Sequence, residues 1–203
     1  MYALVEDNNI TKLITNPKSL VIGDVRYPAK IFSVWSMSEL NAIGIYEVVT
    51  DSTNFKDQAY YNNTNEEYNF ADNQVTRSWG TATPKRLEDE NAVDEDGDPV
   101  LDDDGVQLIN YGLKTDKKRI IKQQASGLLE KTDWHNHKAL DDNTYTIPEN
   151  VKTYRANVRA KSNEMETQID ACTTVEQLET LYTYTTDDDG VQSRPLAEFP
   201  EEI

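Results

Sequence analysis

Residues Gly127 to Ile169 read GLLEKTDWHNHKALDDNTYTIPENVKTYRANVRAKSNEMETQI and organise the rest of the chain. The last third of this stretch predicts a long helix, because apolar or small side chains recur every three or four residues, which places them on one helical face. These stripe residues are Val151, Tyr154, Val158, Ser162, Met165 and Ile169. Pro148 suits the first helical position, where its missing N–H leaves no backbone bond unmade. We therefore expect a helix from Pro148 onward whose stripe packs into a core.

Bulky apolar residues also precede this helix. Leu128-Leu129 comes first, and Thr132-Asp133 looks like a turn ahead of Trp134. Because a tryptophan beside an amphipathic helix commonly packs on its apolar face, we expect Trp134 to be buried against the stripe around Tyr154.

The order of residues across this stretch resembles the C-terminal region of bacteriophage tail fibre assembly proteins. That family's pattern is a double leucine, TDW, a proline and a YR-x-x-LR helix. The matching residues here are Leu128, Leu129, Thr132, Asp133, Trp134, Pro148, Tyr154, Arg155, Val158 and Arg159. The chain departs from the pattern at Val158, where leucine is usual, and in the polar HNH run after the tryptophan. The resemblance covers roughly the second half of the chain.

The resemblance implies a protein that binds the tail fibre polypeptide, shields its sticky surfaces and guides its trimerisation, with no reaction chemistry. A structural subunit of the tail or fibre, retained in the virion and repeated there as a homo-oligomer, is the competing interpretation. An assembly protein would act in the host cytoplasm during assembly. A structural subunit would also be found in the virion tail.

Arg155 and Arg159 lie four residues apart and therefore flank each other on one helix face. Such a like-charge pair is either neutralised by carboxylates of the same chain, with Asp133, Asp141 and Asp142 nearby in sequence, or offered to an acidic partner. Under the second interpretation Trp134, Tyr154, Arg155 and Arg159 form a partner-binding surface.

Tyr60 and Tyr61 are further candidates for such contacts, because tyrosine suits both wet and dry surroundings. The alternative is that they cover a small sheet.

Composition narrows the class of partner. The chain has 203 residues, 37% of them hydrophobic, and a formal net charge of -17. This charge argues against binding to nucleic acid or to an anionic membrane surface, and it suits a basic partner. The single cysteine, Cys172, excludes an internal disulfide. We expect no membrane span and no signal peptide, because the sequence has no long apolar run and its first residues are acidic.

The predicted fold class is α+β, with a β-rich N-terminal half and a helical C-terminal half. We expect a β-rich anchor domain over 1–87, an acidic insert or linker over 88–110, a helical domain over 111–185 and an acidic C-terminal arm over 186–203. In the first half, hairpins are expected over 20–27 and 67–79. Between them, Ser36-Met37-Ser38-Glu39 predicts a capping box for a short helix that stops at Gly44.

Two more helices are expected in the second half. One runs from Thr115, as its cap, to about Leu129, and the other opens with a capping box at Thr173-Thr174-Val175-Glu176.

The acidic insert reads EDENAVDEDGDPVLDDDG from Glu88 to Gly105 and should be a mobile hairpin or loop, because its like charges repel. The sequence DDDGVQ occurs at 102–107 and again at 187–192. Neither copy has the acid spacing of a calcium-binding EF-hand loop, so Asp-Gly hairpin turns explain them better.

No arrangement of residues predicts catalysis. His135 and His137 would share one side of a strand with Asp133, but a zinc site needs four ligands and the chain has no other histidine. The nucleophile, phosphate-binding and dinucleotide motifs are missing from the sequence. We therefore predict a protein that is not an enzyme and that needs neither a metal nor a cofactor.

Overall fold

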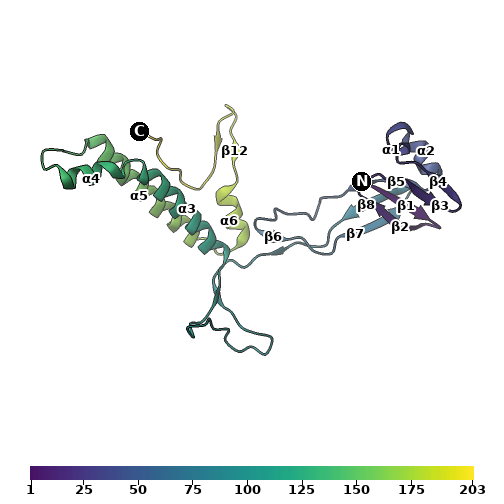
Figure 1. The fold of residues 1–203 in the computed structure, drawn as a ribbon, viewed down its shortest axis with the longest axis horizontal. Helices are drawn as coiled ribbons and strands as arrows, with labels where there is room; N and C mark the ends of the chain where they lie inside the picture. The colour runs from purple at the N-terminus through teal and green to yellow at the C-terminus, as the bar shows by residue number, and fades with distance from the viewer. The chain divides into compact units, whose positions relative to one another are not determined.

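A computed structural model describes residues 1–203, and its chain divides into two compact units, Met1–Thr83 and Pro84–Ile203 (Figure 1). Strands build the first unit and long helices dominate the second, so the predicted α+β class is confirmed. The acidic insert belongs to the second unit, because the division falls at Thr83.

The first unit is built on a five-stranded sheet with the order β2-β1-β5-β8-β7. Its strands are β1 (Tyr2–Glu6), β2 (Asn9–Ile14), β5 (Ile45–Thr50), β7 (Glu67–Ala71) and β8 (Gln74–Ser78). All neighbours are antiparallel except β5 and β8, which are parallel. The edge strands β2 and β7 approach each other, so the sheet curls.

Two hairpins of this sheet turn on residues with positive φ. Asp72 and Asn73 join β7 to β8 with φ of 50° and 58°, which confirms the hairpin predicted over 67–79. Asp7 and Asn8 join β1 to β2 in the same way, with φ of 50° and 64°. Aspartate and asparagine tolerate this left-handed conformation better than other non-glycine residues, which is why a two-residue turn forms without glycine.

One face of the sheet is covered by α1 (Ile31–Val34), α2 (Met37–Ala42) and a hairpin of β3 (Leu20–Ile22) and β4 (Val25–Tyr27). The buried residues here are Leu4, Ile14, Leu20, Ile31, Leu40 and Ile45. A second cluster of Ala3, Val5 and Val75 fills the opposite face. Alternate residues of β1 thus pack into the two clusters, because successive side chains of a strand point to opposite faces of the sheet.

The predicted capping box at the start of α2 is confirmed. The Glu39 N–H donates to Ser36 Oγ at 3.3 Å, and the Ser36 N–H donates to the Glu39 carboxylate at 2.7 Å. After the helix, Gly44 has φ of +80°, and a Cβ there would lie 2.6 Å from the Val5 carbonyl oxygen. Only glycine therefore fits where α2 returns to the sheet.

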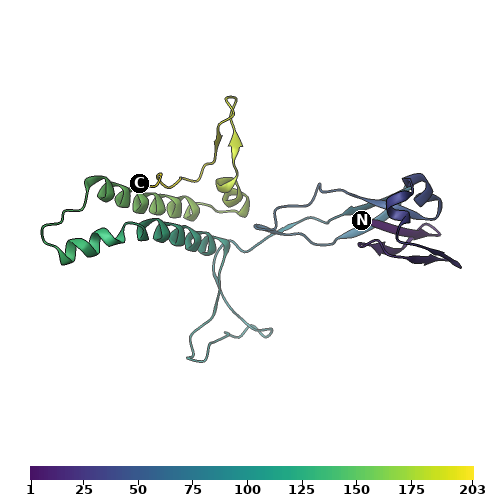
Figure 2. The ribbon, with the colours of Figure 1, turned by 45° about the horizontal axis from the view of Figure 1, so that its top comes forward.

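In the second unit, α3 (Leu113–Glu130) and α5 (Glu149–Asp170) lie side by side and antiparallel (Figures 1 and 2). α4 (Asp133–Asp141) connects them, and α6 (Val175–Tyr182) follows. The predicted stripe of α5 is confirmed in full, since all six of its residues are buried. Cys172 is also buried, directly after α5, and burial raises the pKa of its thiol.

The starts of three helices differ from prediction. Pro148 is the N-cap residue of α5, one position before the first helical residue. α3 begins at Leu113 after Gly112, and Thr115 does not cap it; the Thr115 hydroxyl donates to Asp89 instead. α6 is capped by Thr174, whose side chain accepts the Gln177 N–H, one residue later than the predicted capping box.

Residues 186–203, expected to form an acidic C-terminal arm, instead return to the helices. β12 (Thr185–Thr186) and β13 (Gln192–Ser193) make a short hairpin, and Leu196 is only 2% exposed. Its N–H donates to the Leu181 carbonyl at 3.0 Å, and Phe199 packs near Tyr154. The segment after the hairpin is therefore part of the helical core.

The acidic insert is a folded three-armed β-junction rather than a simple loop. Its stem is the pair β10 (Glu90–Asn91) and β11 (Ile109–Asn110), and its two other arms are hairpins closed at Val93–Pro99 and Leu101–Gln107. Gly112 ties the stem to α3, because a Cβ there would lie 2.5 Å from the backbone of Glu88. The remaining short strands are β6 (Tyr61–Asn62) and β9 (Thr83–Pro84).

Candidate partner-binding surface

Arg155 connects α5 to the end of α3 and to the start of α4. Its guanidinium pairs with Asp133 at 2.7 Å and donates to the Leu129 carbonyl and to Thr132 Oγ1, each at 2.7 Å. Arg155 and Thr132 are both at least nine-tenths buried. Arg155 is therefore an internal brace, as in the first of the two interpretations of the sequence, and its guanidinium is not free for a partner.

Tyr154 is also withdrawn from the surface. It is 5% exposed and packs with Ala125, Val158 and Phe199 in the core between the helices. Its hydroxyl has no hydrogen-bond partner. Arg159 behaves differently, because its side chain is exposed and only donates to the Arg155 carbonyl at 3.4 Å. Of the two arginines, only Arg159 remains available for contact.

Trp134 does not pack on the stripe, and the prediction that it is buried there is wrong. It is 53% exposed and lies in the first turn of α4, because that helix begins at Asp133 instead of following a turn. The indole stacks on the neighbouring His135 ring at 3.7 Å between centroids. One face of the indole is thereby supported while much of the ring meets solvent.

His135 and Tyr145 complete an aromatic cluster with Trp134. The His135 Nδ1 and the Tyr145 hydroxyl are hydrogen-bonded, and the Lys138 ammonium lies 4.4 Å from the Tyr145 ring centroid. The histidines are on a helix, not on a strand, so His135 and His137 point in different directions. Neither histidine belongs to a group of side chains that could hold a metal ion.

A hollow of about 320 Å³ opens beside this aromatic cluster. It lies where the start of α4, the start of α5 and the C-terminal residue meet, and its lining residues are Lys131, Thr132, Trp134, His135, Pro148, Asn150, Val151 and Ile203. Lys131 is paired with Glu202. The hollow therefore places an exposed indole beside walls of mixed polar and apolar side chains, on backbone held by Arg155. Exposed tryptophans are common at protein contact sites, so this hollow is a candidate for one.

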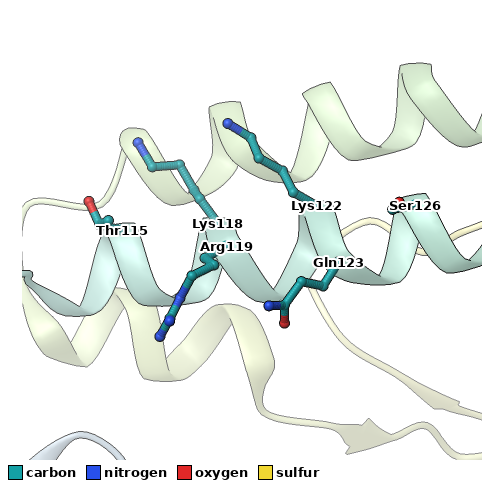
Figure 3. A pocket seen from close by; sticks show the side chains of 6 residues that line it. All are labelled: Thr115, Lys118, Arg119, Lys122, Gln123 and Ser126. Atoms are coloured by element: carbon teal, nitrogen blue, oxygen red, sulfur yellow. The ribbon is translucent and has the colours of Figure 1, made fainter.

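A larger hollow of about 480 Å³ runs along α3 and is lined by Thr115, Lys118, Arg119, Lys122, Gln123 and Ser126 (Figure 3). Its cations are already paired: Lys118 with Asp170 at 2.7 Å, Lys122 with Glu166 at 3.2 Å and Arg119 with Asp116 at 2.8 Å. The hydrogen bond to Asp170 raises the pKa of Lys118. These lysines join α3 to α5, so this hollow offers little free positive charge to an acidic partner.

The two tyrosines proposed from the sequence lie elsewhere. Tyr60 and Tyr61 are each 5% exposed, and the Lys56 ammonium sits 4.4 Å from the centroid of the Tyr61 ring. Both are therefore buried within the first unit, which leaves their rings little surface for contact with a partner.

Of the sequence candidates, the structure leaves Trp134 and Arg159 exposed and buries Tyr154, Arg155, Tyr60 and Tyr61. Tyr145, 6.3 Å from Trp134 between ring centroids, was not predicted as its neighbour. The signal for it was weak, because ten residues separate Tyr145 from His135 and only the helical form of α4 brings the rings together.

None of the helices is long and apolar enough to cross a membrane. Comparison of the chain with protein-family models, with curated protein sequences and with solved structures finds no match.

Proposed function

We propose that this chain is a bacteriophage tail protein that binds tail fibre polypeptide and assists or completes fibre assembly through contacts alone. The observation that carries the proposal is the half-exposed Trp134 beside the hollow between α4 and α5. This tryptophan belongs to the TDW element through which the sequence resembles tail fibre assembly proteins.

The physical basis is the cost of leaving an indole in water. Tryptophan is among the residues that dominate protein interfaces, because it buries a large apolar area while its N–H keeps a hydrogen bond. Here the stack on His135 limits its motion, and Arg155 fixes the backbone from which it projects. A ring held in this way loses little conformational entropy on binding.

The test is co-expression of the chain with the tail fibre polypeptide of the same phage. The proposal expects a complex of the two on purification and a larger yield of soluble, trimeric fibre than from fibre expressed alone. Equal yields with and without the chain, together with no complex, would refute the proposal.

A second candidate is a structural subunit retained in the virion. The separate β unit favours it, because that unit has its own core and lies outside the half of the chain that resembles assembly proteins. Such a unit suits attachment to a particle. Mass spectrometry of purified particles distinguishes the two candidates, since a transient assembly factor is absent from them and a structural subunit is present in a fixed copy number.

A further inference from the structure

The centre of the acidic insert is a closed ring of backbone hydrogen bonds with approximate three-fold symmetry. The Ala92 N–H donates to the Leu108 carbonyl at 2.8 Å, the Val100 N–H to the Ala92 carbonyl at 3.0 Å and the Leu108 N–H to the Val100 carbonyl at 2.9 Å. The three residues follow each other at intervals of eight in the sequence. Each arm of the junction therefore begins at an equivalent point of the ring.

One side chain fills this ring. The Gln107 amide nitrogen lies 2.8 Å from the Ala92 carbonyl oxygen, 3.1 Å from that of Val100 and 2.9 Å from that of Leu108. Each carbonyl thus accepts a backbone N–H and faces the same amide. The junction is consequently a defined structure although it buries few apolar side chains.

The hairpin loops use one carboxylate each to build their turns. Asp94 Oδ1 accepts the N–H groups of Asp96 and Asp98, and Asp102 Oδ1 accepts those of Asp104 and Val106, all at 2.8–3.0 Å. These two carboxylates stabilise the loops. The other carboxylates of the two loops, Glu95, Asp96, Asp98, Asp103 and Asp104, make no such bonds and are exposed.

The junction also carries an apolar face. Val93, Leu101 and Ile109 each follow a ring residue directly, so they occupy equivalent positions around the ring. They are 57%, 53% and 45% exposed. Three half-exposed aliphatic side chains around one centre favour contact with another protein.

The charge around this face decides which kind of partner fits. Residues 88–104 contain ten carboxylates, and no lysine or arginine occurs between Arg86 and Lys114. Glu88 and Glu90 are paired with Lys114 and Arg86, but the carboxylates of the two hairpin loops have no ion pair. The apolar face is therefore rimmed by uncompensated negative charge.

We propose that the three-armed β-junction is a docking surface for a basic polypeptide segment of a partner protein, with aliphatic side chains between its lysines or arginines. The aliphatic side chains would cover Val93, Leu101 and Ile109, while the cations meet the loop carboxylates. A second copy of this chain is a poor occupant, because its net charge of -17 repels the same rim. The inference stands independently of the proposed function.

The test measures binding of the full chain to a short fluorescent peptide of alternating lysine and leucine, with lysine-serine and glutamate-leucine peptides for comparison. The lysine-leucine peptide should bind most tightly, and its affinity should fall with added salt. Replacing both Asp103 and Asp104 by asparagine should weaken binding about fivefold. The matched control, Asp188→Asn with Asp189→Asn, makes the same change in the second DDDGVQ copy and should leave binding within about twofold.

A third variant tests the apolar face by replacing Val93, Leu101 and Ile109 with serine, which should weaken lysine-leucine binding about tenfold and lysine-serine binding little. Equal losses in the two asparagine variants would show attraction to net charge alone and overturn the proposal. Unchanged binding in the serine variant, with its circular dichroism spectrum intact, would also overturn it. Self-association of the free chain that the serine variant abolishes would assign the face to a second copy instead.

Discussion

Arg155 and Arg159 show how two equivalent residues of a motif acquire different roles. They are neighbours on α5, yet the guanidinium of Arg155 is enclosed by Leu129, Thr132 and Asp133, and that of Arg159 meets solvent. The difference arises because the loop between α3 and α4 lies against α5 at the level of Arg155. At the residue scale, the role of each arginine in the YR-x-x-VR pattern is therefore set by the residues that face its guanidinium, and not by the pattern itself.

The contacts of Arg155 predict that its removal lowers the free energy of unfolding. Arg155→Ala removes three bonds and leaves the buried Thr132 hydroxyl and the Leu129 carbonyl with fewer partners, so it should cost about 2–4 kcal/mol of unfolding free energy. The figure is at the low end for a buried pair because Asp133 is 46% exposed. Arg159→Ala is the matched control and should cost less than about 0.5 kcal/mol. Urea unfolding followed by circular dichroism measures both, and similar costs for the two variants would contradict the brace.

The capping hydrogen bonds of Glu39 predict that part of the chain's stability depends on pH. Its hydrogen bonds from the Ser36 backbone and side chain lower the pKa of the carboxyl below its ordinary value of 4.5. A group whose pKa is lowered by folding adds stability above its unfolded pKa, and this stability is lost as the pH falls through the folded pKa. The wild-type chain should therefore melt higher than Glu39→Gln at pH 7, and the gap should narrow by pH 3. A gap of constant size across that range would refute this assignment.

At the scale of elements, the regular parts of the fold were predictable and the irregular parts were not. The α5 stripe was predictable because six positions repeat the helical period, and the capping box of α2 because two side chains define it. The position of Trp134 was not, since it depends on whether Asp133 ends a turn or begins a helix, a local choice with a small energy difference. The junction was missed because its eight-residue period is neither helical nor strand-like.

The role of Gln107 in the junction can be tested by making the same substitution in each of the two DDDGVQ copies. Gln107→Glu would place a negative charge against three carbonyl oxygens, whereas Gln192→Glu changes the second DDDGVQ copy, where Gln192 belongs to the short strand β13. Hydrogen exchange at the Ala92, Val100 and Leu108 amides should become at least about fivefold faster in the first variant only, since a lost bond of this kind is worth about 1 kcal/mol or more. Unchanged protection in Gln107→Glu would show that the ring does not depend on this side chain.

At the scale of the whole molecule, the chain is two units with separate cores. The first is centred on Leu40 and Ile45 and the second on Val158 and Ile169, and all four side chains are essentially buried. We expect fragments 1–83 and 84–203 each to melt cooperatively when expressed alone. Dispersed amide spectra from both would establish this, and a fragment that stays unfolded until the other is added would show a single cooperative unit.

The candidate partner-binding surface also belongs to this scale, because the hollow beside Trp134 combines the start of α4, the start of α5 and the C-terminal residue. Trp134 is its largest exposed side chain and contributes little to the core, so Trp134→Ala should leave the melting temperature nearly unchanged. Tyr184→Ala is a suitable control, since Tyr184 is 51% exposed but lies after α6, outside the lining of the hollow.

The most direct test of the proposed function is the affinity of the full chain for the tail fibre polypeptide, its proposed partner, compared among the wild type, Trp134→Ala and Tyr184→Ala. Truncating a central interface tryptophan costs about 2 kcal/mol or more, so Trp134→Ala should weaken binding about thirtyfold while Tyr184→Ala changes it less than about threefold. If Trp134→Ala binds the fibre as tightly as the wild type does, the hollow beside α4 is not the surface that recognises it.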